Sequence, residues 1–126
     1  IFCCQLFTPL MMRQKYGRII NFSTIAVPLG LEGESVYIAS KSGVEGFTRS
    51  FSKEISSFNI RANCIAPGPI HTDLIKNVAI SKIKAIVDRQ NIKKAFETED
   101  IVNLSKFLLS QSSDSLSGQI LNVGGV

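Results

Sequence analysis

Segments of helical character alternate with short apolar segments along this chain, and this alternation limits its fold more than any other feature. In chain order the segments are a helix at 1–15, a strand at 17–23, a helix at 36–58, a strand at 59–67, a mixed helical stretch at 69–97, a helix from Thr98 and a strand within 117–125. Strands that are separated by helices usually pair in parallel, and the helices then cover both faces of the sheet. The sequence therefore predicts an α/β fold, a doubly wound parallel sheet in one domain that covers residues 1–126.

The helix at 36–58 has the clearest pattern. Its apolar residues recur at spacings of three and four, which is typical of a helix with one buried stripe. The stripe comprises Val44, Phe47, Phe51, Ile55 and Phe58. The stretch before it, residues 24–35, holds one proline and two glycines, so we expect a loop there.

The last helix carries a start signal. Thr98 is a favoured N-cap residue, and Glu99 and Asp100 place negative charge in the first turn. Residues 73–97 have helical spacing without clear caps, and we interpret them as a partly mobile flap. The second half of the chain should therefore form a strand, a flap, a helix and a final strand.

Composition narrows the classes of function. The 126 residues are 44% hydrophobic, enough for one packed core, and the net charge of +4 comes from scattered basic residues without an aromatic-rich stripe. We predict no nucleic-acid partner and interpret the basic residues as a solvated surface. The apolar start of the chain is too short to span a bilayer, and Arg13, Lys15 and Arg18 follow it, so we predict neither membrane insertion nor export.

The cysteines and the histidine exclude other chemistry. Cys3, Cys4 and Cys64 are odd in number and form no CxxC pair, so we predict reduced thiols in a cytoplasmic protein. His71 is the only histidine, so we predict no metal site and no Ser-His-Asp triad.

Tyr37 and Lys41 are the first candidates for catalysis. They are four residues apart, so on a helix they lie about 40° apart on one face. A nearby ammonium favours the phenolate form of tyrosine, and such a phenol can give a proton to a carbonyl or take one from an alcohol. The same spacing also arises by chance, in which case Tyr37 is an ordinary half-buried helix residue.

Hydroxyl side chains follow the first strand at the same expected edge of the sheet. Ser23 is the last residue of the stretch "RIINFS", and Thr24 follows it, thirteen residues before Tyr37. Ligands of doubly wound sheets bind at the carboxyl ends of the strands. A hydroxyl there would be placed to hydrogen-bond a substrate oxygen.

Four stretches resemble the short-chain dehydrogenase/reductase family in order and spacing: "GRIINFST", "YIASKSGVEGFTRSFSKE", "IRANCIAPGPIHTD" and "SGQILNVGG". The resemblance covers essentially the whole chain and is closest to the 3-oxoacyl-[acyl-carrier-protein] reductase type. It implies a Rossmann-like sheet and a cofactor that is NADP or NAD, with NADP slightly favoured. It also implies hydride transfer between the nicotinamide and a small-molecule carbonyl or alcohol substrate.

The resemblance assigns roles to individual residues. It makes Tyr37 the acid/base, with Lys41 favouring the phenolate and holding the hydroxyls of the nicotinamide ribose. The family's substrate-orienting residue is usually Ser, and the usual spacing of thirteen residues before the tyrosine falls on Thr24, with Ser23 as the alternative.

The stretch after the second strand matches the family segment that lies against the nicotinamide. The matching residues are Pro67, Gly68, Ile70 and Thr72. On local sequence alone, Pro67 and Gly68 have a second interpretation as a simple end to the strand. Residues 73–97 correspond to the substrate-covering flap, the most variable part of the family.

The family's phosphate-binding glycine loop has no counterpart here. We expect residues 1–126 to be the C-terminal half of a single Rossmann-type domain, with the nucleotide-binding N-terminal half absent and this stretch alone inactive. The alternative is a truncated, non-catalytic member of the family that acts as a binding or oligomerisation module.

A strip of small residues lies opposite Tyr37 on the predicted helix at 36–58. It comprises Ala39, Gly43, Gly46 and Ser50. Such a strip allows another element to approach closely, either within the subunit or across a two-fold axis. The resemblance favours a homodimer or homotetramer formed through the helices at 1–15 and 36–58.

Overall fold

The computed structural model describes all 126 residues, apart from the side chain of Leu74. The helices and strands are α1 (Phe2–Gln14), β1 (Gly17–Phe22), α2 (Ala26–Leu29), α3 (Ser35–Ile55), β2 (Ile60–Pro67), α4 (Ile80–Arg89), α5 (Thr98–Leu109) and β3 (Ile120–Val123). One-turn 3-10 helices occupy Ser56–Phe58, Asp73–Ile75 and Gln111–Ser113.

The three strands form one parallel sheet in the order β1-β2-β3. Gly17 pairs with Ile60 at the start of the first two strands, and Cys64 pairs with Ile120 further along. β2 lies in the centre and is buried over most of its length, as a strand covered on both faces should be. The predicted parallel sheet is confirmed.

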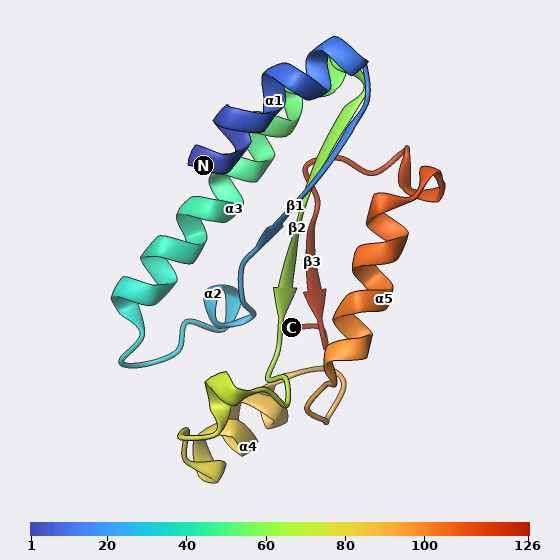
Figure 1. Cartoon of the computed structure of the whole chain (residues 1–126). Helices are drawn as coiled ribbons and strands as arrows, with labels where there is room; N and C mark the ends of the chain where they lie inside the picture. The colour runs from blue at the N-terminus through green and yellow to red at the C-terminus, as the bar shows by residue number, and fades with distance from the viewer.

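Helices cover both faces of this sheet (Figure 1). α1 and α3 lie on one side and α5 lies on the other. On the first side, Phe51 and Ile55 of the predicted stripe are buried against Ile60 and Ala62 of β2, together with Cys4 of α1. The rings of Phe47 and Phe51 stack with their centroids 4.9 Å apart. The helical stripe therefore packs as its spacing predicts.

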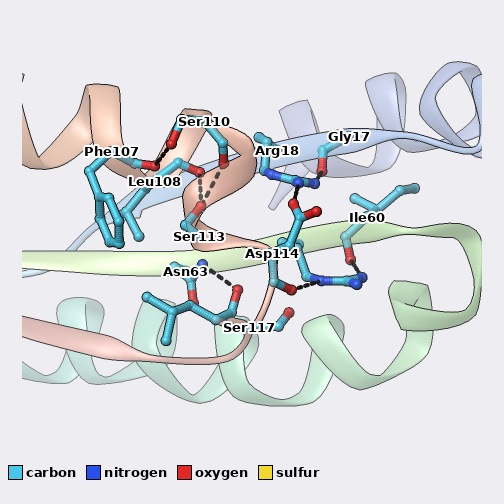
Figure 2. Close-up of polar contacts among 12 residues, drawn as sticks. Gly17, Arg18, Ile60, Asn63, Phe107, Leu108, Ser110, Ser113, Asp114 and Ser117 are labelled. Atoms are coloured by element: carbon cyan, nitrogen blue, oxygen red, sulfur yellow. Dashed lines mark hydrogen bonds and ion pairs between the residues drawn. The ribbon is translucent and has the colours of Figure 1, made fainter.

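Hydrogen bonds between polar side chains and the chain that follows α5 lie near the end of the sheet where β1 and β2 begin (Figure 2). Arg18, whose side chain is only 4% exposed, pairs with the carboxylate of Asp114 in the turn between α5 and β3. Asn63 of β2 donates to the carbonyl of Leu116 at 3.0 Å, and the Ser113 hydroxyl donates to the carbonyl of Leu108 at 2.9 Å. These bonds fix the return of the chain from α5 into β3.

The structure differs from the sequence-based expectations at two places. Residues 24–35 are not a loop throughout, because Ala26–Leu29 forms one helical turn that ends at Gly30 in the left-handed region (φ 58°). Thr98 is not the N-cap of α5 but its first residue; the cap is Glu97, whose backbone is extended and whose N–H donates to the Asp100 carboxylate at 2.9 Å. Both differences keep the predicted order of elements.

Candidate active site

A cleft of about 610 Å³ opens at the carboxyl ends of β1 and β2. All the side chains predicted for catalysis and cofactor binding line it: Ser23, Thr24, Tyr37, Lys41, Pro67, Gly68, Ile70 and Thr72. Leu31, Ile75, Ile83 and Ile86 add an apolar wall. Residues from four separate stretches of the chain therefore meet at the edge of the sheet where ligands of such folds bind.

Tyr37 and Lys41 reach the cleft because α3 begins at Ser35, next to it. Tyr37 lies in the first turn of the helix and is 43% exposed. The Nζ atom of Lys41 lies 5.9 Å from the centroid of the Tyr37 ring and donates a hydrogen bond of 3.0 Å to the carbonyl oxygen of Phe22, the last residue of β1. This bond ties the helix to the strand end and holds an ammonium beside the phenol.

Ser23 and Thr24 are adjacent, but their hydroxyls have different surroundings. The Ser23 backbone continues the sheet, donating to the Ile65 carbonyl at 2.8 Å, and its Oγ donates to Glu45 at 2.7 Å. Thr24 Oγ1 accepts a hydrogen bond of 3.2 Å from the backbone N–H of Ala26, at the start of α2. Among the residues that the structure describes, the Thr24 hydroxyl donates to none, so its proton is available to a ligand in the cleft.

Glu45 was not among the residues predicted for the site. It is 6% exposed, although it is a carboxylate within a helix, and it also pairs with Arg49 at 3.3 Å. Tyr37, Lys41, Glu45 and Arg49 are spaced by four along α3, so they form one row on the helix surface. That spacing was present in the sequence and is the signal that would have pointed to Glu45.

Cys64 of β2 is also close to this row. It has no exposed surface, and burial raises the pKa of its thiol to about 11, with the negative charge of Glu45 acting in the same direction. A thiol with a raised pKa and no access to solvent is a poor nucleophile. Cys64 is thus a core residue beneath the cleft.

The segment that follows β2 is anchored on both sides of Gly68. The Pro67 carbonyl accepts from the Ile25 N–H at 3.0 Å, and the Gly68 N–H donates to the Val123 carbonyl at 3.1 Å. A Cβ atom at position 68 would lie 2.0 Å from the side-chain oxygen of Gln90, which is fully buried. Glycine is therefore required here by the close approach of another side chain.

Ile70 offers an unused amide group on the cleft side of the same segment. It forms a parallel bridge with Phe96, in which Phe96 N–H donates to Pro69 and His71 N–H donates to Phe96. In a parallel pairing of this kind, the N–H and C=O of the central residue point away from its partner. Within the described residues the Ile70 N–H has no hydrogen-bond partner, and its carbonyl accepts only a 3.4 Å contact from Thr72.

Comparison with known proteins extends the assignment beyond geometry. A family model described as enoyl-(acyl carrier protein) reductase matches residues 1–125. The chain belongs to the short-chain dehydrogenase/reductase family. This confirms the resemblance found in its sequence motifs.

Individual short-chain dehydrogenases/reductases agree with this assignment. The chain is 34% identical over 98% of its length to a 3-oxoacyl-[acyl-carrier-protein] reductase, FabG, of Staphylococcus epidermidis, and 37% identical to the protein of the same name from Chlamydia trachomatis. These alignments cover 50% and 49% of the two relatives, so the chain spans about half the length of the curated relatives it matches.

Solved short-chain dehydrogenase/reductase structures share its fold. A 3-oxoacyl-[acyl-carrier protein] reductase from Brucella melitensis superposes with a TM-score of 0.85 at 28% identity, covering 98% of this chain and 47% of that one. A short-chain type dehydrogenase/reductase from Mycobacterium ulcerans gives 0.84 at 27% identity, covering 95% and 44%. The Rossmann-like sheet expected from the motifs is therefore confirmed.

The residues of this family member suit a nicotinamide ribose and carboxamide. The free N–H of Ile70 and its C=O, which accepts only the 3.4 Å contact from Thr72, are one donor and one acceptor on the same residue, which is the complement of a carboxamide. Lys41 uses one of its three N–H groups on Phe22, so two remain for hydroxyl oxygens. The donor set on the cleft thus fits the nicotinamide half of the cofactor.

A second hollow of about 490 Å³ adjoins the flap. It shares Thr72, Ile75, Val78 and Ile83 with the cleft and is also lined by His71, Asp73, Lys76 and Ile80. His71 is exposed and lies 3.9 Å from the Glu97 carboxylate.

No helix among the described residues has the length and apolar character needed to cross a membrane.

Proposed function

We propose that the polypeptide carrying this chain is an NAD(P)-dependent oxidoreductase that moves a hydride between a nicotinamide ring and the carbon of a small-molecule carbonyl or alcohol. The observation that carries the proposal is the shared cleft, in which a phenol, an ammonium and a hydroxyl stand beside the segment 67–72. The family resemblance slightly favours NADP over NAD as the cofactor. We also propose a cytoplasmic location, as the unpaired cysteines suggest.

The residues would divide the reaction as follows. The cofactor, when bound, supplies or receives the hydride. Tyr37 O–H gives its proton to the carbonyl oxygen as the negative charge develops there. Thr24 O–H donates a hydrogen bond to the same oxygen and so holds the carbonyl in place. Lys41, beside the ring, stabilises the phenolate that remains.

The cleft wall indicates the kind of substrate. Leu31, Ile75, Ile83 and Ile86 form an apolar surface opposite the polar group of residues. A carbonyl compound with an apolar substituent would place its oxygen at Tyr37 and its substituent against this wall. The flap residues 73–97 would cover that substituent.

The test is cofactor oxidation by the natural polypeptide that contains this chain. NADPH and NADH are supplied with a panel of ketones and 3-oxoacyl thioesters, and absorbance at the nicotinamide band is followed. Tyr37→Phe should lower kcat by about 10²- to 10⁴-fold, the range for loss of a general acid, and leave cofactor binding unchanged. Tyr16→Phe is the matched control, because Tyr16 lies outside the cleft.

If the polypeptide binds neither nucleotide, the oxidoreductase proposal is rejected and the alternative, a non-catalytic binding or oligomerisation module, is favoured. The observation that supports this alternative is an exposed apolar face on α1. The face comprises Phe2, Leu6, Phe7 and Leu10, with exposed fractions of 75%, 62%, 53% and 56%.

We propose that a second copy of the chain covers this face. The small residues Ala39, Gly43, Gly46 and Ser50 of α3 are exposed as well, and a Cβ added at either glycine would meet nothing within 4 Å. Aromatic and leucine side chains of α1 beside such a strip suit the close approach of helices in a homodimer or homotetramer. Sedimentation equilibrium should give a dimer or tetramer, and Leu6→Lys should shift it toward monomer, whereas Lys82→Glu, at an exposed position of α4, should not.

A further inference from the structure

The carboxylate of Glu45 is buried at the point where α3 crosses the end of β1. Its side chain is 8% exposed, and two groups neutralise or satisfy it: the Ser23 hydroxyl at 2.7 Å and the Arg49 guanidinium at 3.3 Å. A buried carboxylate requires such partners, so its position is determined by them. Among the hydrogen bonds of the described residues, the Glu45 side chain contacts only one residue outside α3, which is Ser23.

Hydrogen bonds to α3 hold the chain at three successive residues at the end of β1, the first being Asn21, whose side-chain amide donates to the Thr48 hydroxyl at 2.9 Å. Lys41 binds the carbonyl of Phe22, and Glu45 binds the hydroxyl of Ser23. Lys41 and Glu45 are one helical turn apart, so their two bonds form a clamp on the last residue of β1 and the residue that follows it. The next residue after the clamp is Thr24.

Ser23 and Thr24 both line the cleft, and the clamp decides which of their hydroxyl protons is free for a ligand. Side chains of successive residues at a strand end point to opposite sides. With Ser23 Oγ held against Glu45 inside the core, Thr24 lines the cleft and keeps its hydroxyl proton free, as described above. An apolar residue at position 45 would leave the Ser23 hydroxyl buried without this acceptor, and a rotation toward the cleft would be its way to regain a partner.

We propose that Glu45 is a positioning residue: by holding the Ser23 hydroxyl in the core, it fixes the end of β1 so that Thr24 presents the hydroxyl that orients the substrate oxygen. This inference rests on the oxidoreductase function proposed above. In this role Glu45 neither packs the hydrophobic core nor transfers the proton; it acts through Ser23 on the position of Thr24.

The experiment uses the natural polypeptide that carries this chain, with four variants. Glu45→Gln keeps an oxygen that accepts from Ser23, Glu45→Leu removes it, Ser23→Ala removes the donor, and the double variant Ser23→Ala with Glu45→Leu removes both. Glu54→Leu is the matched control, because Glu54 is an exposed acid on the same helix. Thermal unfolding and active-site titration give the amount of folded protein in each case, so that kcat refers to folded sites only.

We expect Glu45→Leu and Ser23→Ala each to lower kcat by about tenfold with KM for the cofactor unchanged, since loss of alignment acts on the chemical step. The double variant should be no worse than either single one, because the two residues act as one unit. Glu45→Gln should stay within about threefold of the parent, the value expected when the hydrogen bond is kept. Additive losses in the double variant, or equal kcat in Glu45→Leu and Glu54→Leu, would overturn the proposal.

Crystal structures of the parent and of Glu45→Leu provide a readout that does not need turnover. The proposal requires Ser23 Oγ to leave its position in the core and Thr24 Oγ1 to move relative to Tyr37. Unchanged positions of both hydroxyls would overturn it. If the parent protein reduces no carbonyl compound, the proposed function fails, and the crystal structures still decide whether Glu45 places Thr24. If Glu45→Leu does not fold, Ser23→Ala alone decides: a kcat equal to that of the parent, with Thr24 Oγ1 in its parent position, would overturn the proposal.

Discussion

The ammonium of Lys41 donates a 3.0 Å hydrogen bond to the carbonyl oxygen of Phe22 and lies 5.9 Å from the ring centre of Tyr37. One side chain thus joins α3 to the end of β1 and brings positive charge to the phenol. Two separate properties depend on it, the packing of the helix on the strand and the electrostatic environment of Tyr37, the proposed acid/base.

Lys41→Met should separate these two properties. We expect kcat/KM to fall by about 10²-fold or more, the effect of removing one preorganised charge from a reaction centre. Stability should fall by only about 1 kcal/mol, the net contribution of one hydrogen bond. The measurements are steady-state kinetics and urea unfolding, with Lys53→Met, an exposed lysine in the last turn of α3, as control. Equal activity of the two variants would contradict the role given to Lys41.

Gly68→Ala should disturb the segment 67–72, which we propose to contact the cofactor, through a clash with Gln90. The added Cβ would lie 2.0 Å from the Gln90 side-chain oxygen, and Gln90 is held by hydrogen bonds of 3.0 and 2.9 Å to the carbonyls of Ile92 and Lys94. We expect a loss of about 1–3 kcal/mol of stability, typical of overpacking, together with weaker nicotinamide binding. Because the clash needs both side chains, Gly68→Ala combined with Gln90→Ala should lose less than the sum of the single variants. Additive losses by urea unfolding would show that this contact is not the cause.

Asp114→Asn should affect stability and leave activity unchanged. It removes the negative charge that faces the buried guanidinium of Arg18, at the edge of the sheet opposite the cleft. We expect a loss of about 1–2 kcal/mol, because a buried charged donor then lacks its strongest acceptor. Asp88→Asn, at an exposed position of α4, should change stability by less than about 0.5 kcal/mol. A lower kcat per folded molecule in Asp114→Asn would contradict the view that this edge is structural.

Much of this arrangement followed from local patterns in the sequence. The spacing of Phe47, Phe51 and Ile55 determined which face of α3 packs on the sheet, and the alternation of elements determined the parallel order. Tyr37 and Lys41 could be placed together because they lie on one helix, where separation in sequence fixes separation in space.

Contacts between elements could not be predicted in the same way. The spacing by four places Glu45 on the same side of α3 as Tyr37 and Lys41, but its burial was missed because a charged side chain is normally assigned to the surface and because this burial depends on Ser23 from another element. The choice between Ser23 and Thr24 was left open because a shift of one residue at a strand end reverses the side to which a side chain points. Thr98 and Glu97 are both able to cap a helix, and only the extended backbone of Glu97 decides between them.

The raised pKa of Cys64 makes stability depend on pH in the alkaline range. Burial, aided by the charge of Glu45, raises this pKa from 9.0 to about 11, so between these values the native state holds a proton that the unfolded state releases. The free energy of unfolding should therefore fall as pH rises from about 9 to 11, with a slope of up to about 1.4 kcal/mol per pH unit from this group. Cys64→Ala is the control, because other groups titrate in the same range and only the difference in slope between the two proteins reports on Cys64. In the native protein at pH 8, iodoacetamide should leave Cys64 intact, and it should modify this thiol only after the protein is unfolded. Parallel stability curves for the two proteins, or rapid modification of Cys64 in the native protein, would mean that Cys64 is neither as buried nor as weakly acidic as the packing beneath the cleft requires.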